Sequence, residues 1–387
     1  MLVIEIIDIL IFVLVALCTI YLFFFALMGI KEKLIPYPEA KKKNRFLVLF
    51  PAYKEDIIII NSVKTFMAQN YPKDYFNVLV ISDHMTQETD NALKDLGAQI
   101  VKATYSNSSK AKALALAMSQ KKDNNYDIVV ILDADNLVED TFLNEINNCY
   151  ESGSIAIQAH RVAKNRDTDI ALLDAVSEEI NNSIFRRGHV RVGISSALIG
   201  SGMAFDFRWF KDNVEALNTA GEDKELEVLL LKQGVYIDFL NWTYVYDEKT
   251  RKETEFSKQR RRWLGAQFDI LKSSIHDLPW AIKTKNWDYI DKLLQWMMLP
   301  RVVVMGLTFI FAIGMLFLNW QWSIKWWVLF VLLLYTFAMA IPDFLVDKKL
   351  KKTFRKLPIV FLIMIYNIFR IKGVNKHFIH TVKNEEL

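Results

Sequence analysis

The sequence has few cysteines, no strong excess of charge of one sign, and no internal repeat or low-complexity tract. Cys18 lies in an apolar run near the N-terminus and Cys149 in the more polar middle of the chain, so a disulfide between them is implausible. The cysteine usage therefore indicates a reducing compartment for the main domain. A formal net charge of +4 says little about partners, and we expect no nucleic-acid partner.

The features of a cleaved signal peptide are also missing. Such a peptide has a basic start, a short apolar core and a small-residue cleavage site. Residues 1–30 instead form a long apolar run that only Glu5 and Asp8 interrupt. This run exceeds the roughly 20 residues that a helix needs to cross the hydrocarbon core of a membrane. We therefore expect an uncleaved transmembrane anchor over residues 1–30.

Apolar residues make up 52% of the sequence and charged residues 24%, so the chain is not a pure membrane bundle. The apolar excess lies at the two ends, and residues 302–318 and 326–346 form two further candidate spans. We expect a short loop between them that carries clustered tryptophans, which suit a membrane–water interface. The apolar stretch 357–369 is too short to cross, so it predicts an interfacial or re-entrant helix.

Basic residues follow the first and the third predicted span, in the linker 31–44 and in DKKLKKTFRK. The positive-inside rule places both flanks, and the domain between the spans, in the cytoplasm. The sequence thus predicts a multi-pass protein of the cell (inner or plasma) membrane. The expected parts are an anchor (1–30), a basic linker (31–44), a cytoplasmic domain (45–250), a segment with interfacial helices (251–300), two transmembrane helices (301–346) and a basic C-terminal segment (347–387).

The middle of the chain alternates strand-like and helix-like stretches. RFLVLFPAY, NVLVISD, QIVKAT and DIVVILDAD are typical of buried strands, and each of the first three is followed by a helical pattern. This alternation predicts an α/β domain with a mostly parallel sheet that helices cover on both faces. Ligands of such sheets bind beyond the carboxyl ends of the strands, where the chain places Asp83, Asp133 and Asp135.

Asp133 and Asp135 give the sharpest local signal, because they directly follow a predicted buried strand. Two carboxylates spaced by one residue can jointly hold Mg²⁺ or Mn²⁺, which bridges diphosphate oxygens and neutralises a leaving diphosphate. An Asp-x-Asp motif alone is weak, because aspartate is common in turns. Its place at a strand end favours the metal site.

Asp83 and Lys110 are candidates for nucleotide binding. Asp83 ends the second predicted strand and could accept a hydrogen bond from a nucleobase or a ribose, or it could serve in a turn or helix cap. Lys110 opens a predicted helix and could meet a phosphate, helped by the helix N-terminus. The alternative for Lys110 is a solvated surface lysine.

Two further segments are candidates for the acceptor side. Gly200, Ser201 and Gly202 form a small-residue loop that lets the backbone approach a ligand closely, although a tight turn would explain it equally. Glu222 and Asp223 begin a predicted helix, where acids also cap the positive end of the helix dipole. Either carboxylate could instead take the proton of an attacking hydroxyl.

The segment KQRRRWLGAQF brings Gln259, three arginines and Trp263 together. Guanidinium groups suit a diphosphate, and an indole ring can stack on a sugar. A basic helix that binds anionic lipid next to the membrane is the alternative.

Taken in order, these motifs resemble family 2 glycosyltransferases of the GT-A fold, a Rossmann-like fold of nucleotide-diphospho-sugar transferases. The resemblance covers about residues 45–268 and is strongest to the membrane-embedded branch with cellulose, hyaluronan, chitin-oligosaccharide and poly-N-acetylglucosamine synthases. FPAYKED is similar to the opening PAYNE segment, SKAKAL to GKAxAL, DAD to the metal motif, GED to TED and QRRRW to QxxRW. Gly221 stands where the family has threonine, and His84 follows Asp83 where it often has a second acid.

The resemblance implies roles for individual residues. It makes Asp223, with Glu222, the catalytic pair and Asp133 and Asp135 the metal ligands. It assigns nucleotide-sugar binding to Pro51, Ala52, Tyr53, Glu55, Asp83, Lys110 and Asp133, and acceptor or donor-phosphate binding to Gly200, Ser201, Gly202, Gln259, Arg262 and Trp263.

The resemblance also implies an activity. We expect inverting transfer from a nucleotide-sugar, a UDP-sugar, to a growing glycan in exopolysaccharide, capsule or other surface-polysaccharide synthesis, with Mg²⁺ or Mn²⁺ as cofactor and β-linked product. Single transfer to a lipid-linked acceptor is the alternative. A transporter would predict polar residues within the spans, which the mostly apolar spans do not offer. Three spans cannot enclose a sugar channel, so we expect self-association or a separate export partner.

Overall fold

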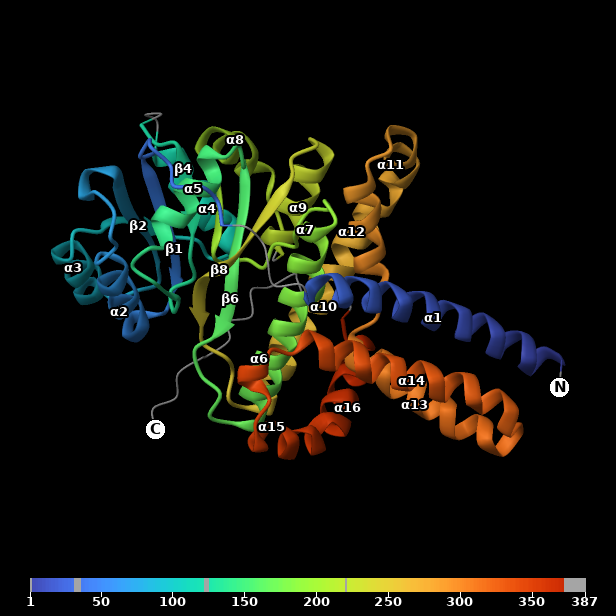
Figure 1. Ribbon diagram of the computed structural model, residues 1–387. Coiled ribbons are helices and arrows are strands. Elements are labelled where there is room, and N and C mark those ends of the chain that lie inside the picture. The colour runs from blue at the N-terminus through green and yellow to red at the C-terminus, as the bar shows by residue number, and fades with distance from the viewer. Residues whose placement is uncertain (1, 31–35, 122–124, 220, 372–387) are drawn as a thin grey trace.

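The structure is a computed structural model that describes residues 2–30, 36–121, 125–219 and 221–371. An α/β domain forms one end of the molecule, and three long apolar helices extend away from it (Figure 1). The first residues of the predicted basic linker, 31–35, and most of the predicted C-terminal tail, 372–387, lie outside the described residues.

One half of the sheet is parallel, as the alternation of strands and helices predicts. Its strands are the apolar runs of the sequence, which are buried on both faces. The order from the edge inward is β3 (Gln99–Ala103), β2 (Phe76–Asp83), β1 (Phe46–Tyr53) and β4 (Ile128–Ile131). All three pairings in this half are parallel, so the carboxyl ends of the strands share one edge.

The other half of the sheet is mixed. β7 (Met203–Asp206) runs antiparallel to both β4 and β6 (Ala156–Ala163). The long strand β8 (Ile237–Asp247) pairs parallel with β6, and the two-residue strand β5 (Leu137–Val138) closes the edge antiparallel to β8. The sheet as a whole is mixed, with four of its seven pairings parallel and three antiparallel.

Helices cover both faces of the sheet. Alternate residues of β1 point to opposite faces, so that Val48 and Phe50 pack in one core and Leu47 and Leu49 in the other. The first core is closed by α2 (Asp56–Phe66), α3 (Gln87–Asp95) and α5 (Phe142–Glu151). The second is closed by α4 (Lys110–Gln120), α8 (Phe207–Asn213), α9 (Glu222–Lys232), α10 (Glu253–Ser274), α11 (Leu278–Thr284) and α12 (Trp287–Met297).

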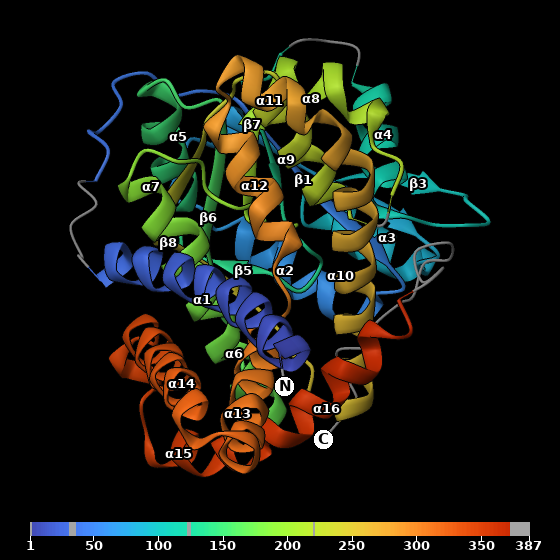
Figure 2. The same cartoon turned by 90° about the vertical axis from the view of Figure 1, so that its right-hand side faces the viewer.

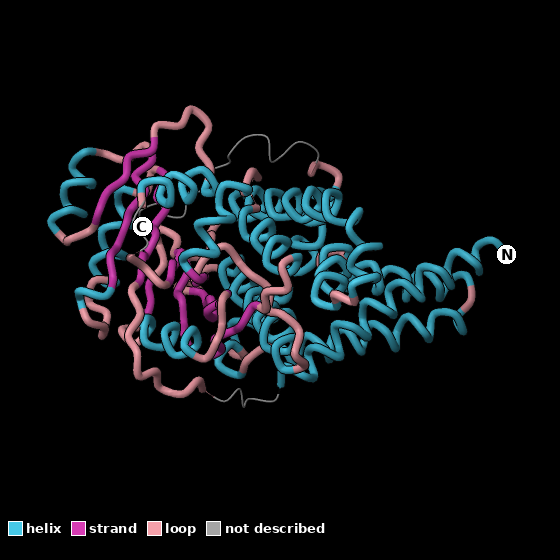
Figure 3. Tube along the Cα trace, turned by 90° about the horizontal axis from the view of Figure 1, so that it is seen from above, coloured by secondary structure: helices cyan, strands magenta, loops and turns pink. Residues whose placement is uncertain are grey.

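Three helices are long and apolar enough to cross a membrane: α1 (Leu2–Ile30), α13 (Arg301–Leu318) and α14 (Trp320–Ala340). They run side by side away from the α/β domain, with the N-terminus near their far end (Figure 3). The prediction of one N-terminal and two C-terminal apolar helices is confirmed. The short apolar stretch forms α16 (Leu357–Ile368), which follows the basic helix α15 (Lys348–Thr353).

The predicted tryptophan-rich loop between the two C-terminal spans is wrong. Only Asn319 separates α13 from α14, because its side chain accepts a hydrogen bond from the backbone N–H of Gln321 at 2.9 Å and starts the next helix at once. The second span therefore begins at Trp320 and ends at Ala340, six residues earlier at each end than expected. Trp326 is fully buried rather than interfacial, and it stacks on Phe311 of α13 with ring centroids 4.7 Å apart.

A contact with Asp8 accounts for part of the burial of Trp326. The carboxylate of Asp8, on α1, accepts a hydrogen bond from the indole N–H of Trp326 at 2.8 Å and pairs with Lys325. Carboxylates are tolerated among apolar helices when they are paired in this way. Asp8 therefore fixes α1 to α14 near the far ends of the helices.

α1 contacts the α/β domain so closely that there is no room for side chains at two glycines of the contact. It crosses a π-helix (Asn182–Gly188) that continues α6 (Asp169–Asn181) and leads into the short helix α7 (His189–Arg191). A Cβ atom on Gly29 would lie 2.6 Å from the carbonyl oxygen of Ser183, and one on Gly188 would overlap the carbonyl oxygen of Phe25. The two backbones are thus in direct contact, and they form a close-packed joint.

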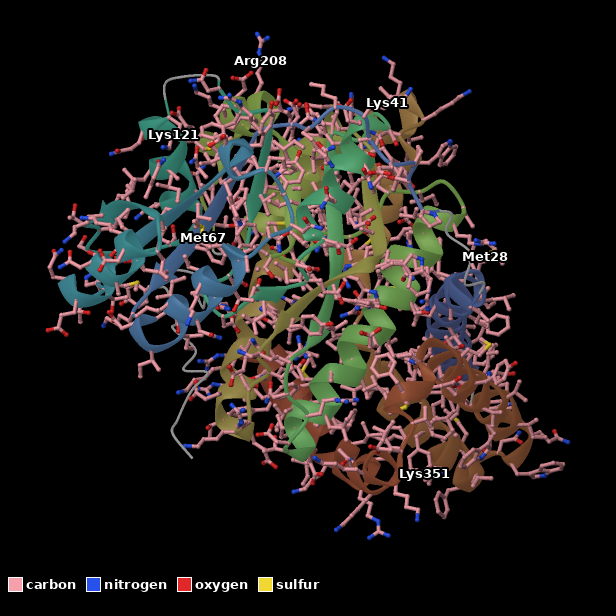
Figure 4. All side chains as sticks on the ribbon, turned by 60° about the vertical axis from the view of Figure 1, so that its left-hand side comes forward. Met28, Lys41, Met67, Lys121, Arg208 and Lys351 are labelled. Atoms are coloured by element: carbon pink, nitrogen blue, oxygen red, sulfur yellow. The ribbon has the colours of Figure 1, made fainter. Side chains whose placement is uncertain are left out.

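Several helices gather where the apolar helices meet the domain. In Figure 2, α12 lies above α1, α16 lies beside α13, and α10 stands on the same side as α16. Below them α15 exposes basic side chains, and Lys351 lies on the outer surface (Figure 4). α6 connects the two regions, because its buried residues pack against α1 on one side and against α13 and α16 on the other.

Candidate functional site

The carboxyl ends of β1 and β2 form one wall of the site. Tyr53 ends β1 and is the register partner of Asp83, which ends β2 and is almost completely buried. Both strands leave the sheet through a residue in the left-handed region, Lys54 (φ 55°) and His84 (φ 57°). That conformation costs a non-glycine residue about 1–2 kcal/mol. It turns His84 back, so that its Nδ1 lies 2.6 Å from Asp83 Oδ1.

Lys110 is the centre of the site. Its backbone opens α4, where Ser109 caps the helix, and its side chain is enclosed by three other segments. Nζ donates hydrogen bonds to Asp133 Oδ1 and to the carbonyl oxygen of Gly200, both at 2.5 Å, and lies 3.5 Å from Glu222 Oε1. Burial alone would lower the pKa of Lys110, but Asp133 and Glu222 outweigh burial and raise it. Lys110 therefore stays charged, and its side chain contacts the DAD motif, the glycine-rich loop at Gly200 and the GED motif.

The predicted metal ligands have a third partner. Carboxylate oxygens of Asp133, Asp135 and Asp247 all lie within 4.8 Å of one another. Asp247 is the last residue of β8, and sequence reasoning missed it. The backbone N–H of Glu248 donates to Asp135 Oδ2 at 3.1 Å, which ties this strand end to the DAD turn. Three carboxylates in this arrangement fit a hard divalent cation such as Mg²⁺ or Mn²⁺.

The glycine-rich loop has two different parts. Gly200 (φ 80°) faces the site, since a Cβ atom there would lie 3.6 Å from Glu222 Oε1 and 3.8 Å from Asp223 Oδ2. Gly202 (φ 65°) is held behind the site, where a Cβ atom would lie 2.8 Å from Val245 Cγ2. Ser201 between them is fully buried. The predicted ligand-binding role therefore has a geometric basis at Gly200, whereas Ser201 and Gly202 do not line the cavity.

The GED segment begins α9 and packs against α10. Gly221 has no space for a larger residue, because its Cβ would lie 2.8 Å from Cβ of Ala266. Burial, together with Asp223 and Asp133, raises the pKa of Glu222 to about 7, although Lys110 opposes the shift. Asp223 accepts a hydrogen bond from the backbone N–H of Lys224 at 2.9 Å, which orients its carboxylate.

α10 supplies the opposite wall through Gln259, Arg262 and Trp263. Arg262 and Trp263 lie about one helical turn before Ala266, the contact point of Gly221, and Gln259 lies about two turns before it. Gln259 Oε1 is buried with no hydrogen-bond partner among the described residues. The guanidinium group of Arg260 lies 4.5 Å from the ring centroid of Trp263.

One cavity of about 1020 Å³ joins these walls. Apart from Ser201 and Gly202, every residue that the sequence analysis assigned to the site lines it. The cavity also reaches residues that sequence reasoning did not single out. Among them are Asp247 beside the predicted metal ligands, and Arg161, Arg186 and Arg301. Arg161 and Arg186 are buried and Arg301 is half-buried, and the sequence carries no local signal of this.

The comparisons with known proteins agree with this architecture. The sequence model of the family described as "Glycosyltransferase like family 2" matches residues 44–266, more than half of the chain. A curated relative, the probable glycosyltransferase YdaM of Bacillus subtilis (strain 168), is 22% identical over 248 residues. The match covers 60% of this chain and 57% of the relative, so the chain spans little more than half of the relative's length.

Among solved structures, the chain is similar to mannosyltransferase PcManGT from Pyrobaculum calidifontis, determined in complex with GDP-Man and Mn²⁺. The TM-score is 0.53 at 15% sequence identity, and the match covers 87% of this chain and 97% of that one. At this identity the likeness shows the fold, which is the predicted GT-A fold.

Proposed function

The chain belongs to the family 2-like glycosyltransferases, and we propose that it moves a sugar from a UDP-sugar to a growing glycan, with inversion at the anomeric carbon. The observation that carries this proposal is the position of Lys110. Its Nζ lies 2.5 Å from Asp133 on the donor side and 3.5 Å from Glu222 on the side of the catalytic pair. One buried cation thus links the leaving diphosphate to the reacting centre.

In this proposal the nucleotide lies along the ends of β1 and β2. Asp83 accepts a hydrogen bond from the base or the ribose, and Pro51, Ala52, Tyr53 and Glu55 form the surface beside it. The positive charge of Lys110 meets the diphosphate at the N-terminus of α4. Gln259 and Arg262 approach from α10, and the indole of Trp263 stacks on a sugar.

Asp133, Asp135 and Asp247 would hold the divalent cation. Mg²⁺ or Mn²⁺ bound there supplies charge that neutralises the leaving diphosphate. The fit rests on three convergent carboxylates, and Lys249 and Asn136 hold the one that β8 contributes. Lys249 Nζ lies 2.9 Å from Asp247 Oδ2, and Asn136 Nδ2 lies 3.4 Å from Asp247 Oδ1.

Asp223 is the proposed general base. The acceptor hydroxyl oxygen forms a bond to the anomeric carbon while the bond to the diphosphate breaks, and Asp223 takes the hydroxyl proton. Glu222 is suited to a different task, because it is buried beside Lys110 and its pKa is raised to about 7. We assign Glu222 to holding Lys110 in place, and Gly200 to admitting the substrate close to both carboxylates.

The apolar helices support a place in the cell membrane. α1, α13 and α14 would cross it, and the basic α15 would lie on the cytoplasmic side, where nucleotide-sugars are made. Residues along α12 and α16 that expose apolar side chains would rest in the interface, among them Trp287, Leu294, Leu362 and Tyr366. This placement suits synthesis of an exopolysaccharide, a capsule or another β-linked surface glycan.

A second candidate is transfer of a single sugar to a lipid-linked acceptor. It is favoured by the apolar lining of the cavity where it meets α1, α13 and α14. Product length separates the two candidates, because repeated addition gives a ladder of products and single transfer gives one.

The proposal can be tested by incubating membranes that contain the chain with a panel of radiolabelled nucleotide-sugars and Mn²⁺. One donor should give labelled glycan with the wild type. Asp223→Asn should lower the rate about 100- to 10,000-fold while nucleotide binding persists. Asp95→Asn, an exposed carboxylate on α3, is the matched control and should leave the rate unchanged. Transfer at the wild-type rate by Asp223→Asn would refute the assignment of the base.

A further inference from the structure

The cavity does not end at the catalytic pair. It continues along α10, past Gln259 and Arg260, and enters the space between the apolar helices. α1, α13, α14 and α16 contribute to the lining of this part, together with α6 and α10. Representative residues are Leu22 of α1, Val304 and Met305 of α13, Leu334 and Phe337 of α14, and Val360 of α16. A chain-like apolar group would fit these surroundings, and a nucleotide or a free glycan would not.

Two arginines stand at the junction between the polar and the apolar part. Arg260 pairs with Asp174 of α6. Arg301, the first residue of α13, donates from Nη2 to the carbonyl oxygen of Ser177 at 3.0 Å and to Ser177 Oγ at 3.1 Å. Asp174 and Ser177 are three residues apart on α6, so the two guanidinium groups approach the same face of that helix. Arg301 Nη1 is buried and has no hydrogen-bond partner among the described residues.

The ion pairs at this junction are shared unevenly among its basic groups. Glu178 alone faces three cations, at 2.8 Å from Arg161 and 3.4 Å from both Arg186 and Lys249. Lys249 has a second partner in Asp247, and Arg301 has no ion pair among the described residues. Glu179 and Glu227 also lie near Arg186, and Asp133 near Arg161, so the basic group of this cluster that lacks an ion pair among the described residues is Arg301, which has Arg260 and Arg186 as neighbours.

A guanidinium group that has a buried nitrogen and no ion pair is costly unless an anion compensates its charge. Guanidinium groups pair well with phosphate, to which they can donate two parallel hydrogen bonds. The cavity therefore offers a phosphate-binding group directly beside an apolar chain-binding region. The ligand with this combination is an amphiphile that carries a phosphate between its polar and its apolar part.

We propose that the junction at Arg260 and Arg301 binds the phosphate or diphosphate of a lipid-linked glycan acceptor, and that the lipid chain lies between α1, α13 and α14. This rests on the proposed glycosyl transfer and names the acceptor class. The growing glycan is then held at the enzyme by its lipid carrier, and the reacting hydroxyl projects toward Asp223.

The register of α10 indicates that sugars separate the phosphate from the reacting hydroxyl. Ala266 contacts Gly221 next to the catalytic pair, and Arg260 lies six residues earlier on the same helix. Six residues of α-helix rise by about 9 Å. We therefore place the phosphate away from Asp223, so that a sugar hydroxyl, and not the phosphate, is the nucleophile. Trp263 lies between these points, where it can stack on an intervening sugar.

Binding can be tested without glycosyl transfer, so that the outcome does not depend on the activity. The purified full chain in detergent, with UDP and Mn²⁺ present to fill the donor site, is titrated with farnesyl phosphate. Farnesol and inorganic phosphate are titrated in parallel, and dihexanoyl phosphatidylglycerol represents a phospholipid of the bilayer. Farnesyl phosphate should bind more tightly than each of the other three.

Arg301→Gln should weaken farnesyl phosphate binding by about tenfold or more, as expected for loss of charge-assisted hydrogen bonds. Binding of farnesol should be unchanged, and Arg301→Lys should restore part of the affinity because it keeps the charge. Unchanged UDP–Mn²⁺ binding shows that each variant is folded. Arg355→Gln, an exposed arginine outside the cavity, is the matched control and should bind like the wild type.

Equal binding of farnesyl phosphate by wild type and Arg301→Gln would overturn the proposal, and so would equal binding of farnesyl phosphate and farnesol by the wild type. If phosphatidylglycerol binds as tightly as farnesyl phosphate, the cavity is a site for bilayer lipid, and the proposal is also overturned.

The separation of phosphate and reacting hydroxyl along α10 can be tested independently. Farnesyl phosphate should remain unglycosylated by mass spectrometry after incubation with the donor panel, and a glycosylated product would refute the separation along α10.

Discussion

Asp247 and Asp135 present carboxylate oxygens within 4.8 Å of each other, although one ends β8 and the other lies in the turn after β4. Asp133 completes the cluster. The hydrogen bond from the Glu248 N–H to Asp135 holds the two segments together before any ligand arrives. The site thus depends on the last strand of the sheet as much as on the DAD motif.

Asp247→Asn should raise the Mn²⁺ concentration needed for half-maximal activity by at least about tenfold, because an amide is a weaker ligand than a carboxylate. Titration of UDP binding with Mn²⁺, followed by chelation, measures the same effect without transfer. Asp212→Asn, an exposed carboxylate on α8, should leave the Mn²⁺ dependence unchanged. A wild-type Mn²⁺ dependence in Asp247→Asn would remove this residue from the metal site.

Glu222 should make the stability of the protein fall with rising pH. Its pKa is raised from 4.5 to about 7 in the folded chain, so the folded state binds more protons than the unfolded state between these pH values. The free energy of unfolding therefore decreases as pH rises through this window. Glu222→Gln should flatten the pH dependence of Tm between about pH 4.5 and 7. An unchanged slope in the variant would contradict the raised pKa.

Gly202 is required both for its backbone conformation and for its contact with Val245. Gly202→Ala should destabilise the protein by roughly 1–3 kcal/mol more than Gly193→Ala, because only the first substitution overpacks a core. Both glycines have positive φ, at 65° and 78°, but a Cβ on Gly193 would meet nothing within 4 Å. Comparison of the two Tm values thus separates steric overlap from backbone strain, and equal losses would contradict the close contact.

Orientation in the membrane can be checked with reporter fusions. Fusions after Arg45 and after Leu387 should report a cytoplasmic location, and an insertion at Asn319 should report the opposite side. Asn319 is the suitable position because it alone separates α13 from α14, whereas Ser323 is buried within α14. A non-cytoplasmic signal after Arg45 would overturn the orientation and separate the enzyme from its donor supply.

Much of the fold follows from local sequence patterns. β1, β2 and β4 are short apolar runs between turn residues, and such runs form buried strands almost regardless of their partners. The other half of the sheet could not be read in this way. β7 has four residues and β5 two, so neither is long enough to show a period, and their antiparallel pairing depends on where the chain returns.

Some residues of the candidate site could likewise be predicted from local sequence patterns, and others could not. Asp133, Asp135, Lys110 and Asp223 were predictable because each stands at the end of a strand or the start of a helix. Asp247 was not, because a single aspartate after the long strand β8 has no motif around it, and only the pairing of β8 with β6 brings it to the cluster. The missing ion pair of Arg301 was hidden for a related reason, since its contact with Ser177 and the sharing of Glu178 arise only from the packing of α6.

In the proposed membrane placement, the joint at Gly29 and Gly188 would couple the enzyme to the thickness of its bilayer. α1 has 29 residues and a length of about 43 Å, which exceeds a hydrocarbon core of about 30 Å, so in that placement it must tilt or project from the membrane. An apolar helix longer than the hydrocarbon core is accommodated by tilting, kinking or local thickening of the bilayer. Because α1 and the π-helix meet backbone to backbone, a change of tilt would be passed on to the α/β domain. Lipid chain length would then act on the height at which the acceptor meets Asp223.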